Sequence, residues 1–275
     1  MMTRRLIVSG DDLGLHEAIN RGVIEAHERG IVTCASVVAC GRAFDHACGL
    51  VATRPQLDLG AHLTLVEEAP ILAPDVLKTL APEGRFPRSY RQLFLELLAG
   101  RIELREVEWE LEAQIQRLKS AGLPISHLDS HQHTHLFPAL RTILLDLALR
   151  HGFAGIRAAA RVTPKATKFG LLLAPLAKMA GREATGRGLK SPDTLWLPAT
   201  SGRVTAAQLL EGIPHLPEGV TELVVHPGLD QAVLDREYPN WNFDWPGELA
   251  AVMAPEVRES LVRENIQLTR YSELS

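Results

Sequence analysis

Short apolar segments alternate along the chain with longer segments in which apolar residues recur every three or four positions. The short segments are rich in Val, Ile and Leu and end at polar or glycine residues, which is typical of buried strands. We predict seven strands, at residues 6–8, 32–39, 57–65, 125–130, 153–157, 222–226 and 266–269.

The longer segments have the period of amphipathic helices. In residues 105–120, the clearest case, apolar side chains at 107, 111, 115 and 118 share one face and charged side chains fill the other. We predict helices at 19–30, 43–51, 93–98, 105–120, 140–149, 206–213 and 256–263, the last with Pro255 in its first turn. Strands followed by helices predict a parallel sheet, and their spread through the whole chain favours one (β/α) barrel-like domain over residues 1–275.

Composition excludes several classes of protein. The chain has 275 residues and is 46% apolar, which suits a globular fold, and its net charge of −4 gives no reason to expect nucleic acid as a partner. No apolar run approaches the ~20 residues that span a bilayer, and the first residues do not resemble a secretory leader. The three cysteines at 34, 40 and 48 form no CxxC pair, so we predict reduced thiols in a cytoplasmic protein.

Polar clusters follow several predicted strands. They are Asp11-Asp12, His62, the segment 127–135 and His226. In parallel α/β folds the carboxyl ends of the strands carry the active site, because the loops after them converge.

The segment 127–135 is the strongest of these signals. His127, Asp129, His131, His133 and His135 occupy every second position, so they would share one face if the strand continued through them. Inward polar groups need partners, and a divalent cation is a common one. The alternative is a solvated histidine-rich turn. We expect some of the five to orient ligands or contact substrate instead of binding metal.

The adjacent acids Asp11 and Asp12 have two interpretations. They are an ordinary strand-to-helix turn or helix cap, or they form a site in which a cation beside one relieves their repulsion and the other acts as a base. His62 alone is more typical of a core histidine, but it stands at a strand end like the other clusters.

In this order, the clusters resemble the YdjC-like (ChbG-type) carbohydrate deacetylase family. The matching stretches are LIVSGDDLG at 6–14, GIVT at 30–33, GAHLTL at 60–65, HLDSHQH at 127–133 and ELVVHPG at 222–228. Leu13 and Gln132 depart from the family pattern, which affects pocket shape more than chemistry. The segment from His62 to Pro70 is similar to the branch associated with hopanoid biosynthesis (HpnK-like).

The resemblance implies a (β/α) barrel-like fold of the glycoside hydrolase/deacetylase type, with a variable insert at about 159–200. It implies removal of an acetyl group from an N-acetylated amino sugar and one divalent ion, held by Asp12, His62 and His131. Magnesium is often named for the family, whereas this ligand set also suits zinc, iron or cobalt. Asp11 would be the general base.

The remaining residues take supporting roles in this hypothesis. His226 would protonate the leaving amine or stabilise the oxyanion, unless it only braces the His-Pro-Gly turn. His127, Asp129 and His133 would orient ligands or contact substrate. The alternatives are a phosphoesterase or another C–N hydrolase, a silent sugar-binding protein, and a structural metal site closed to water.

Two further segments have open interpretations. Residues 159–190 carry basic side chains around an apolar stretch, which is typical of a segment that touches an anionic membrane, or of a solvated helix packed on the barrel. Trp241, Phe243 and Trp245 either stack on a sugar face or belong to the core of the barrel rim. The partner we expect is the sugar substrate; a homodimer is left open.

Overall fold

The computed structural model describes residues 3–163, 168–197 and 202–274, with the backbone alone at 168–173. Within them, nine strands form one parallel sheet in the order β5-β4-β3-β2-β1-β8-β7-β6, and β9 also pairs with β1. The strands are β1 (Arg4–Leu13), β2 (Cys34–Val37), β3 (Asp58–Leu63), β4 (Ile125–Ser130), β5 (Gly155–Ile156), β6 (Arg161–Thr163), β7 (Thr194–Trp196), β8 (Gly219–Val225) and β9 (Ile266–Leu268).

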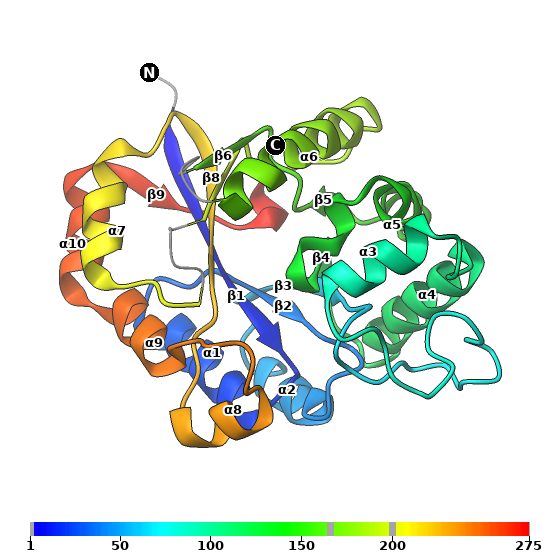
Figure 1. The fold of residues 1–275 in the computed structure, drawn as a ribbon. Helices are drawn as coiled ribbons and strands as arrows, with labels where there is room; N and C mark the ends of the chain where they lie inside the picture. The colour runs from blue at the N-terminus through cyan, green and yellow to red at the C-terminus, as the bar shows by residue number, and fades with distance from the viewer. Residues whose placement is uncertain (1–2, 164–167, 198–201, 275) are drawn as a thin grey trace.

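Helices surround this sheet (Figure 1). The α-helices are α1 (Glu17–Arg29), α2 (Phe44–Val51), α3 (Tyr90–Leu98), α4 (Leu104–Ser120), α5 (Pro138–His151), α6 (Lys168–Gly186), α7 (Ala206–Gly212), α8 (Gln231–Glu237), α9 (Trp245–Met253) and α10 (Pro255–Arg263). Short 3-10 turns lie at η1 (His131–Leu136), η2 (Ile213–His215) and η3 (Tyr271–Glu273). Pro255 starts α10, as predicted.

The sheet curls into an incomplete barrel around β1. β8 pairs with β1 from Arg4 to Gly10, while β9 and β2 pair with its beginning and its end. A single parallel bridge between Gly155 and Lys190 links β5, at one end of the sheet, to the segment before β7 near the other end. The predicted barrel-like fold is therefore confirmed, as a half-closed barrel.

Each of the seven predicted strands is present, but β6 and β7 were not predicted. Each has three residues, too few for the alternation that identifies a strand in sequence. The helices α8 and α9 were also not predicted, whereas α6 lies in the segment 159–190, for which a helix packed on the barrel was one of the two interpretations. α9 is apolar over most of its length and lacks a clear polar stripe.

The inner and outer faces of β1 differ in chemistry. Leu6 and Val8 belong to the large apolar core, whereas Ile7 belongs to a separate small cluster with Cys34 and Tyr271. Successive side chains of a strand point to opposite faces, so Ser9 and Asp11 follow Ile7 on the inner face of β1. The barrel interior thus changes from apolar at one end to polar at the other.

The segment predicted to touch a membrane contains α6. Ala177, Ala180 and Ala184 are buried in the core, so the described part of the helix packs against the protein. Lys165 and the side chains of residues 168–173 lie outside the described residues. Within the described chain, no helix combines the length and the apolar character that crossing a membrane requires.

Candidate metal centre and active-site cavity

The ends of β1, β3, β4 and β8 converge on a cavity of about 310 Å³. Most of the residues singled out in the sequence line it, including two of the three aromatic residues between positions 241 and 245. These lining residues are Asp11, Asp12, His62, His131, His133, His226, Trp241 and Phe243.

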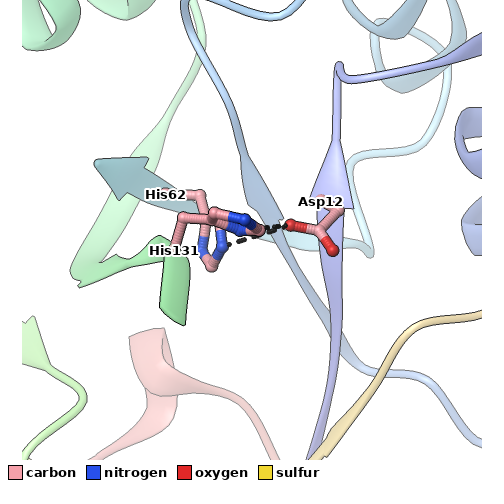
Figure 2. Close-up of side chains that lie close together, drawn as sticks. All are labelled: Asp12, His62 and His131. Carbon is pink, nitrogen blue, oxygen red and sulfur yellow. Dashed lines mark hydrogen bonds and ion pairs between the residues drawn. The ribbon is translucent and has the colours of Figure 1, made fainter. Parts of the chain in front are cut away.

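Asp12, His62 and His131 all line the cavity. Their side chains lie close together (Figure 2). The Asp12 Oδ1 atom lies 2.9 Å from His131 Nδ1 and 3.4 Å from His62 Nε2. One ligand atom from each residue lies within 4.8 Å of the others, which is compatible with a shared metal ion. Asp12 Oδ2 is buried and has no hydrogen-bond partner among the described residues.

Protons on the two imidazoles balance the charge of Asp12. Burial would raise the pKa of Asp12, but His131 and His62 hold it well below its usual value. Burial would lower the pKa of both histidines, yet Asp129 raises that of His62 to about 10 and Asp12 raises that of His131 to about 9. Anionic oxygens facing imidazole nitrogens form a donor set that suits a divalent cation.

Asp129 orients His62 from inside the barrel. Its Oδ1 atom lies 2.8 Å from His62 Nδ1, and its Oδ2 atom accepts a hydrogen bond of 2.6 Å from Ser36. In the neutral imidazole that a metal ion would bind, Nδ1–H donates to this carboxylate and the lone pair is at Nε2, the atom that faces Asp12. Asp129 therefore orients His62, a candidate metal ligand, and does not line the cavity.

The strand β4 ends at Ser130, as predicted, so the shared face that a longer strand would give residues 127–135 does not form. Ser130 Oγ accepts hydrogen bonds from the backbone N–H of His135 at 2.8 Å and from the Thr134 hydroxyl at 3.0 Å. These bonds close a tight 3-10 turn in which Gln132 and His133 have φ of 53°. The turn places His131 and His133 at the cavity without the alternation of a strand.

His127 and His135 point into the protein and do not line the cavity. The ring of His127 stacks on Tyr271 with 3.7 Å between centroids, and burial lowers its pKa to about 4. The Nε2 atom of His135 lies 2.6 Å from the carbonyl oxygen of Arg157, and burial lowers its pKa to about 4. Both rings are therefore neutral near pH 7.

Arg157 was not predicted as a site residue, yet it places a buried guanidinium in the barrel interior. It is buried, and its guanidinium contacts Asp11 through Nη1 at 2.6 Å and Nη2 at 2.8 Å, Asp129 at 2.7 Å and Glu222 at 2.9 Å. Burial raises the pKa of Glu222 to about 7 although Arg157 opposes this shift. The hydroxyl of Tyr271 donates to the other oxygen of Glu222 at 2.7 Å.

The contacts of Arg157 also bear on a second metal ion. Asp11, His62 and Asp129 form a further group close enough to ligate a cation. However, both oxygens of Asp11 and Oδ2 of Asp129 already face the guanidinium. A positive charge therefore stands beside this second group, which disfavours the two-metal phosphoesterase alternative.

His226 lines the cavity after β8, and its partner is Glu248 on α9. The His226 Nδ1 atom lies 3.5 Å from Glu248 Oε2, and the same carboxylate accepts from the backbone N–H of His226. Burial would lower the pKa of His226, but Glu248 raises it. The imidazole therefore holds a proton more readily than a free histidine does.

The predicted aromatic cluster divides between two roles. Trp245 is fully buried in the core, whereas Trp241 and Phe243 are half-buried and line the cavity. The Trp241 ring lies 5.1 Å from that of His131, between centroids. Two apolar faces are thus available beside the candidate metal ligands.

Comparisons with known proteins find one family model and several named relatives. The sequence model of the YdjC-like protein family matches residues 5–263. A carbohydrate deacetylase of Brevibacillus brevis is 40% identical over 144 residues, covering 52% of this chain and 55% of the relative. A chitooligosaccharide deacetylase of Escherichia fergusonii is 36% identical over 154 residues, covering 56% and 59%. The chain spans little more than half the length of these curated relatives.

Two solved structures share the fold. A protein of Enterococcus faecalis V583, assigned provisionally to cellobiose-phosphate cleavage, superposes with a TM-score of 0.77 at 25% identity over 98% of both chains. An uncharacterised protein of Agrobacterium tumefaciens C58 superposes with a TM-score of 0.52 at 12% identity over 99% of this chain and 89% of the other, which shows the fold alone.

Proposed function

Because this chain belongs to the YdjC-like family, we propose that it is a metal-dependent hydrolase that removes the acetyl group from an N-acetylated amino sugar. The convergence of Asp12, His62 and His131 at a cavity that also exposes Asp11 carries this proposal. The relatives named as carbohydrate and chitooligosaccharide deacetylases support it.

The three residues fit a divalent ion on their own chemistry. They offer one carboxylate and two imidazoles, and the Asp12 Oδ2 atom is buried without a described partner. Because they line a cavity, the site is open to water and substrate, unlike a closed structural site. When bound, the ion would lower the pKa of water and polarise the acetyl carbonyl. Ligand softness favours zinc, iron or cobalt, and magnesium remains a candidate.

Asp11 is the proposed general base. Its carboxylate lies at the cavity and is fixed in plane by the two guanidinium contacts of Arg157. Its Oδ1 atom also accepts from the Ser9 hydroxyl at 3.4 Å, whereas Oδ2 has only the Arg157 contact among the described residues, so Oδ2 keeps a lone pair to accept a proton from the attacking water. Arg157 thus holds the base in orientation, and fixed orientation contributes to catalysis by proton transfer.

His226 is the proposed general acid. Glu248 favours its protonated form, and its place at the cavity allows it to donate a proton to the leaving amine. Trp241 and Phe243 offer apolar faces for a sugar ring. His133 would contact the substrate, while His127 would only support the interior.

The substrate is an N-acetylglucosamine-containing oligosaccharide or a glycolipid such as an acetylglucosaminyl hopanoid. Acetate release from chitobiose, free N-acetylglucosamine and an acetylglucosaminyl lipid would separate these candidates. Each assay is run on metal-stripped protein and again after one metal at a time is added back. Wild-type protein that releases no acetate from any of the three with any metal would contradict the proposal.

Two variants test the assigned roles. Asp11→Asn should keep the metal content and lose turnover by roughly 100-fold or more, the usual worth of a general base. His131→Ala should lose both metal and turnover. His215→Ala is the control, because His215 is exposed and does not line the cavity. It should change neither the metal content nor the turnover. Near-normal turnover by Asp11→Asn would show that Asp11 is not the base.

The membrane contact of residues 159–190 stays a prediction, and vesicle co-sedimentation tests it. Binding to vesicles should require anionic lipid and should fall as salt is added. Binding that is independent of both would contradict an electrostatic contact.

A further inference from the structure

Glu67 lies against His131 on the side opposite Asp12. Its Oε2 atom is 3.3 Å from His131 Nε2 and 3.0 Å from the side-chain Nε2 of Gln132. Its side chain is 23% exposed and borders the active-site cavity as well as two neighbouring hollows. Glu67 was not among the predicted site residues.

His131 thus stands between two carboxylates, one at each ring nitrogen. Its Nδ1 atom lies 2.9 Å from Asp12 Oδ1, and its Nε2 atom faces Glu67. A neutral imidazole has one N–H and one lone pair. If Nε2–H donates to Glu67, the lone pair is at Nδ1, the atom that points into the candidate metal site. Asp129 acts on His62 in the same way: its carboxylate faces one ring nitrogen, and the other nitrogen points to the candidate metal site.

The backbone of Glu67 is held in an uncommon conformation. Its φ is 66°, in the left-handed region that residues other than glycine seldom adopt. The backbone N–H of Glu67 donates to the Pro87 carbonyl at 2.9 Å, and that of Phe86 donates to the Glu68 carbonyl at 3.1 Å. The loop from Phe86 to Pro87 therefore holds Glu67 in this conformation.

Gln132 fixes the carboxylate from the other side. Its Oε1 atom accepts from the backbone N–H of Tyr90 at 3.0 Å, so its amide group must present Nε2 to Glu67. Gln132 itself has φ of 53°. Glu67 and Gln132, two residues with left-handed backbone, thus contact each other through Glu67 Oε2. The same oxygen atom contacts His131, a candidate metal ligand.

We propose that Glu67 is a positioning residue that makes His131 bind metal through Nδ1, and that Gln132 holds Glu67 in place. The inference rests on the metal site of the proposed function. It assigns Glu67 an effect on metal affinity through His131 and no contact with the ion. Residues that orient metal-binding histidines typically change metal affinity by about 10- to 100-fold when they are mutated.

The test compares zinc affinity in three variants, measured by competition with a chromophoric chelator. Glu67→Gln should raise the Kd for zinc about 10-fold or more. Glu67→Gly deletes the carboxylate but suits the left-handed backbone, so it should weaken zinc binding further without unfolding the loop. Glu68→Gln is the control, because it removes the neighbouring negative charge but no hydrogen bond to His131 among the described contacts. Its increase in the Kd for zinc should be less than about a third of the increase in Glu67→Gln.

The atom that His131 uses gives a second measurement. Long-range ¹H–¹⁵N spectra of the zinc-loaded protein should show the proton on Nε2 in the wild type, with loss of that proton's protection in Glu67→Gly. A wild-type protein that binds no zinc would contradict the proposed function. Wild-type zinc binding with unchanged affinity in both Glu67 variants, an equal loss in Glu68→Gln, or a proton on Nδ1 would overturn this inference alone.

Discussion

Replacing Arg157 with Lys would test whether one guanidinium balances the charge of the barrel interior. Arg157 makes five polar contacts with Ser9, Asp11, Asp129 and Glu222, and its side chain is 1% exposed. Lysine keeps the positive charge but concentrates it at one nitrogen with three donors. The substitution therefore separates the charge of Arg157 from its geometry.

The expected loss follows from the number of contacts. Three donors replace five contacts, so at least two contacts are lost, and hydrogen bonds to charged groups contribute about 1.5–3 kcal/mol each. We expect Arg157→Lys to lower the free energy of unfolding by about 3 kcal/mol or more. In a chain of this length that lowers the Tm by roughly 6 °C or more. Removal of the charge itself, as in Arg157→Met, would cost more because three buried carboxylates would lose their counter-ion.

Urea unfolding of metal-stripped protein at pH 7, followed by tryptophan fluorescence, measures this loss. The control is Arg150→Lys, in which the arginine is 52% exposed and pairs with Glu108 and Glu112 at the surface. Solvent screens that pair, so the control should keep its unfolding midpoint. Equal midpoints for the two variants, at an unchanged m-value, would refute the idea that Arg157 organises the interior.

Two other substitutions test the charge of Glu222 in the barrel interior and the close contact between α1 and the loop that follows His226. Glu222→Gln probes the pKa of about 7 that burial gives this carboxyl group. Between about pH 4.5 and 7 the folded chain binds more protons than the unfolded chain. The wild type therefore loses stability as the pH rises through that range. Relative to the wild type, the variant should gain about 2 kcal/mol between pH 5 and pH 8 in urea unfolding, and a flat difference would contradict the shift. Gly22→Ala would place a Cβ atom 2.4 Å from Gly228 Cα, next to the loop that follows His226. We expect about 1–3 kcal/mol of destabilisation together with lower deacetylation, and full activity would show that the loop can move without effect.

The polar residues of the candidate site could be located from the sequence because they stand at or beside the carboxyl ends of predicted strands, whereas the choice of Asp12, His62 and His131 as metal ligands came from the family resemblance. Asp12 and His62 belong to β1 and β3, which are separated in the sheet by β2. They meet because the inner face of β2 carries the small side chain of Ser36 near its carboxyl end, and Ser36 itself bonds to Asp129. A sequence pattern shows which residues stand at strand ends, and the curl of a parallel sheet brings those ends together.

The supporting residues could not be predicted because their partners lie far away in the sequence. Arg157 ends the predicted strand 153–157, where a charged residue in a buried strand was a signal, but nothing local shows that its partner is Asp11, 146 positions earlier. Glu67 lies among prolines in a loop without periodicity, and its role depends on the left-handed conformation of its own backbone. The turn after Ser130 likewise depends on a serine hydroxyl that accepts two hydrogen bonds, which alternation does not reveal.

The charges of the barrel interior explain why we expect one metal ion per chain. Asp11, Asp129 and Glu222 all contact Arg157, so their charge is already compensated within the protein. Asp12 has no such contact among the described residues and is balanced only by protons on two histidines. A divalent ion can displace those protons, whereas at Asp11 and Asp129 it would have to displace a buried guanidinium. Zinc titration should therefore saturate at one ion per chain with release of protons, and two tightly bound ions would mean that Arg157 leaves the interior when metal binds.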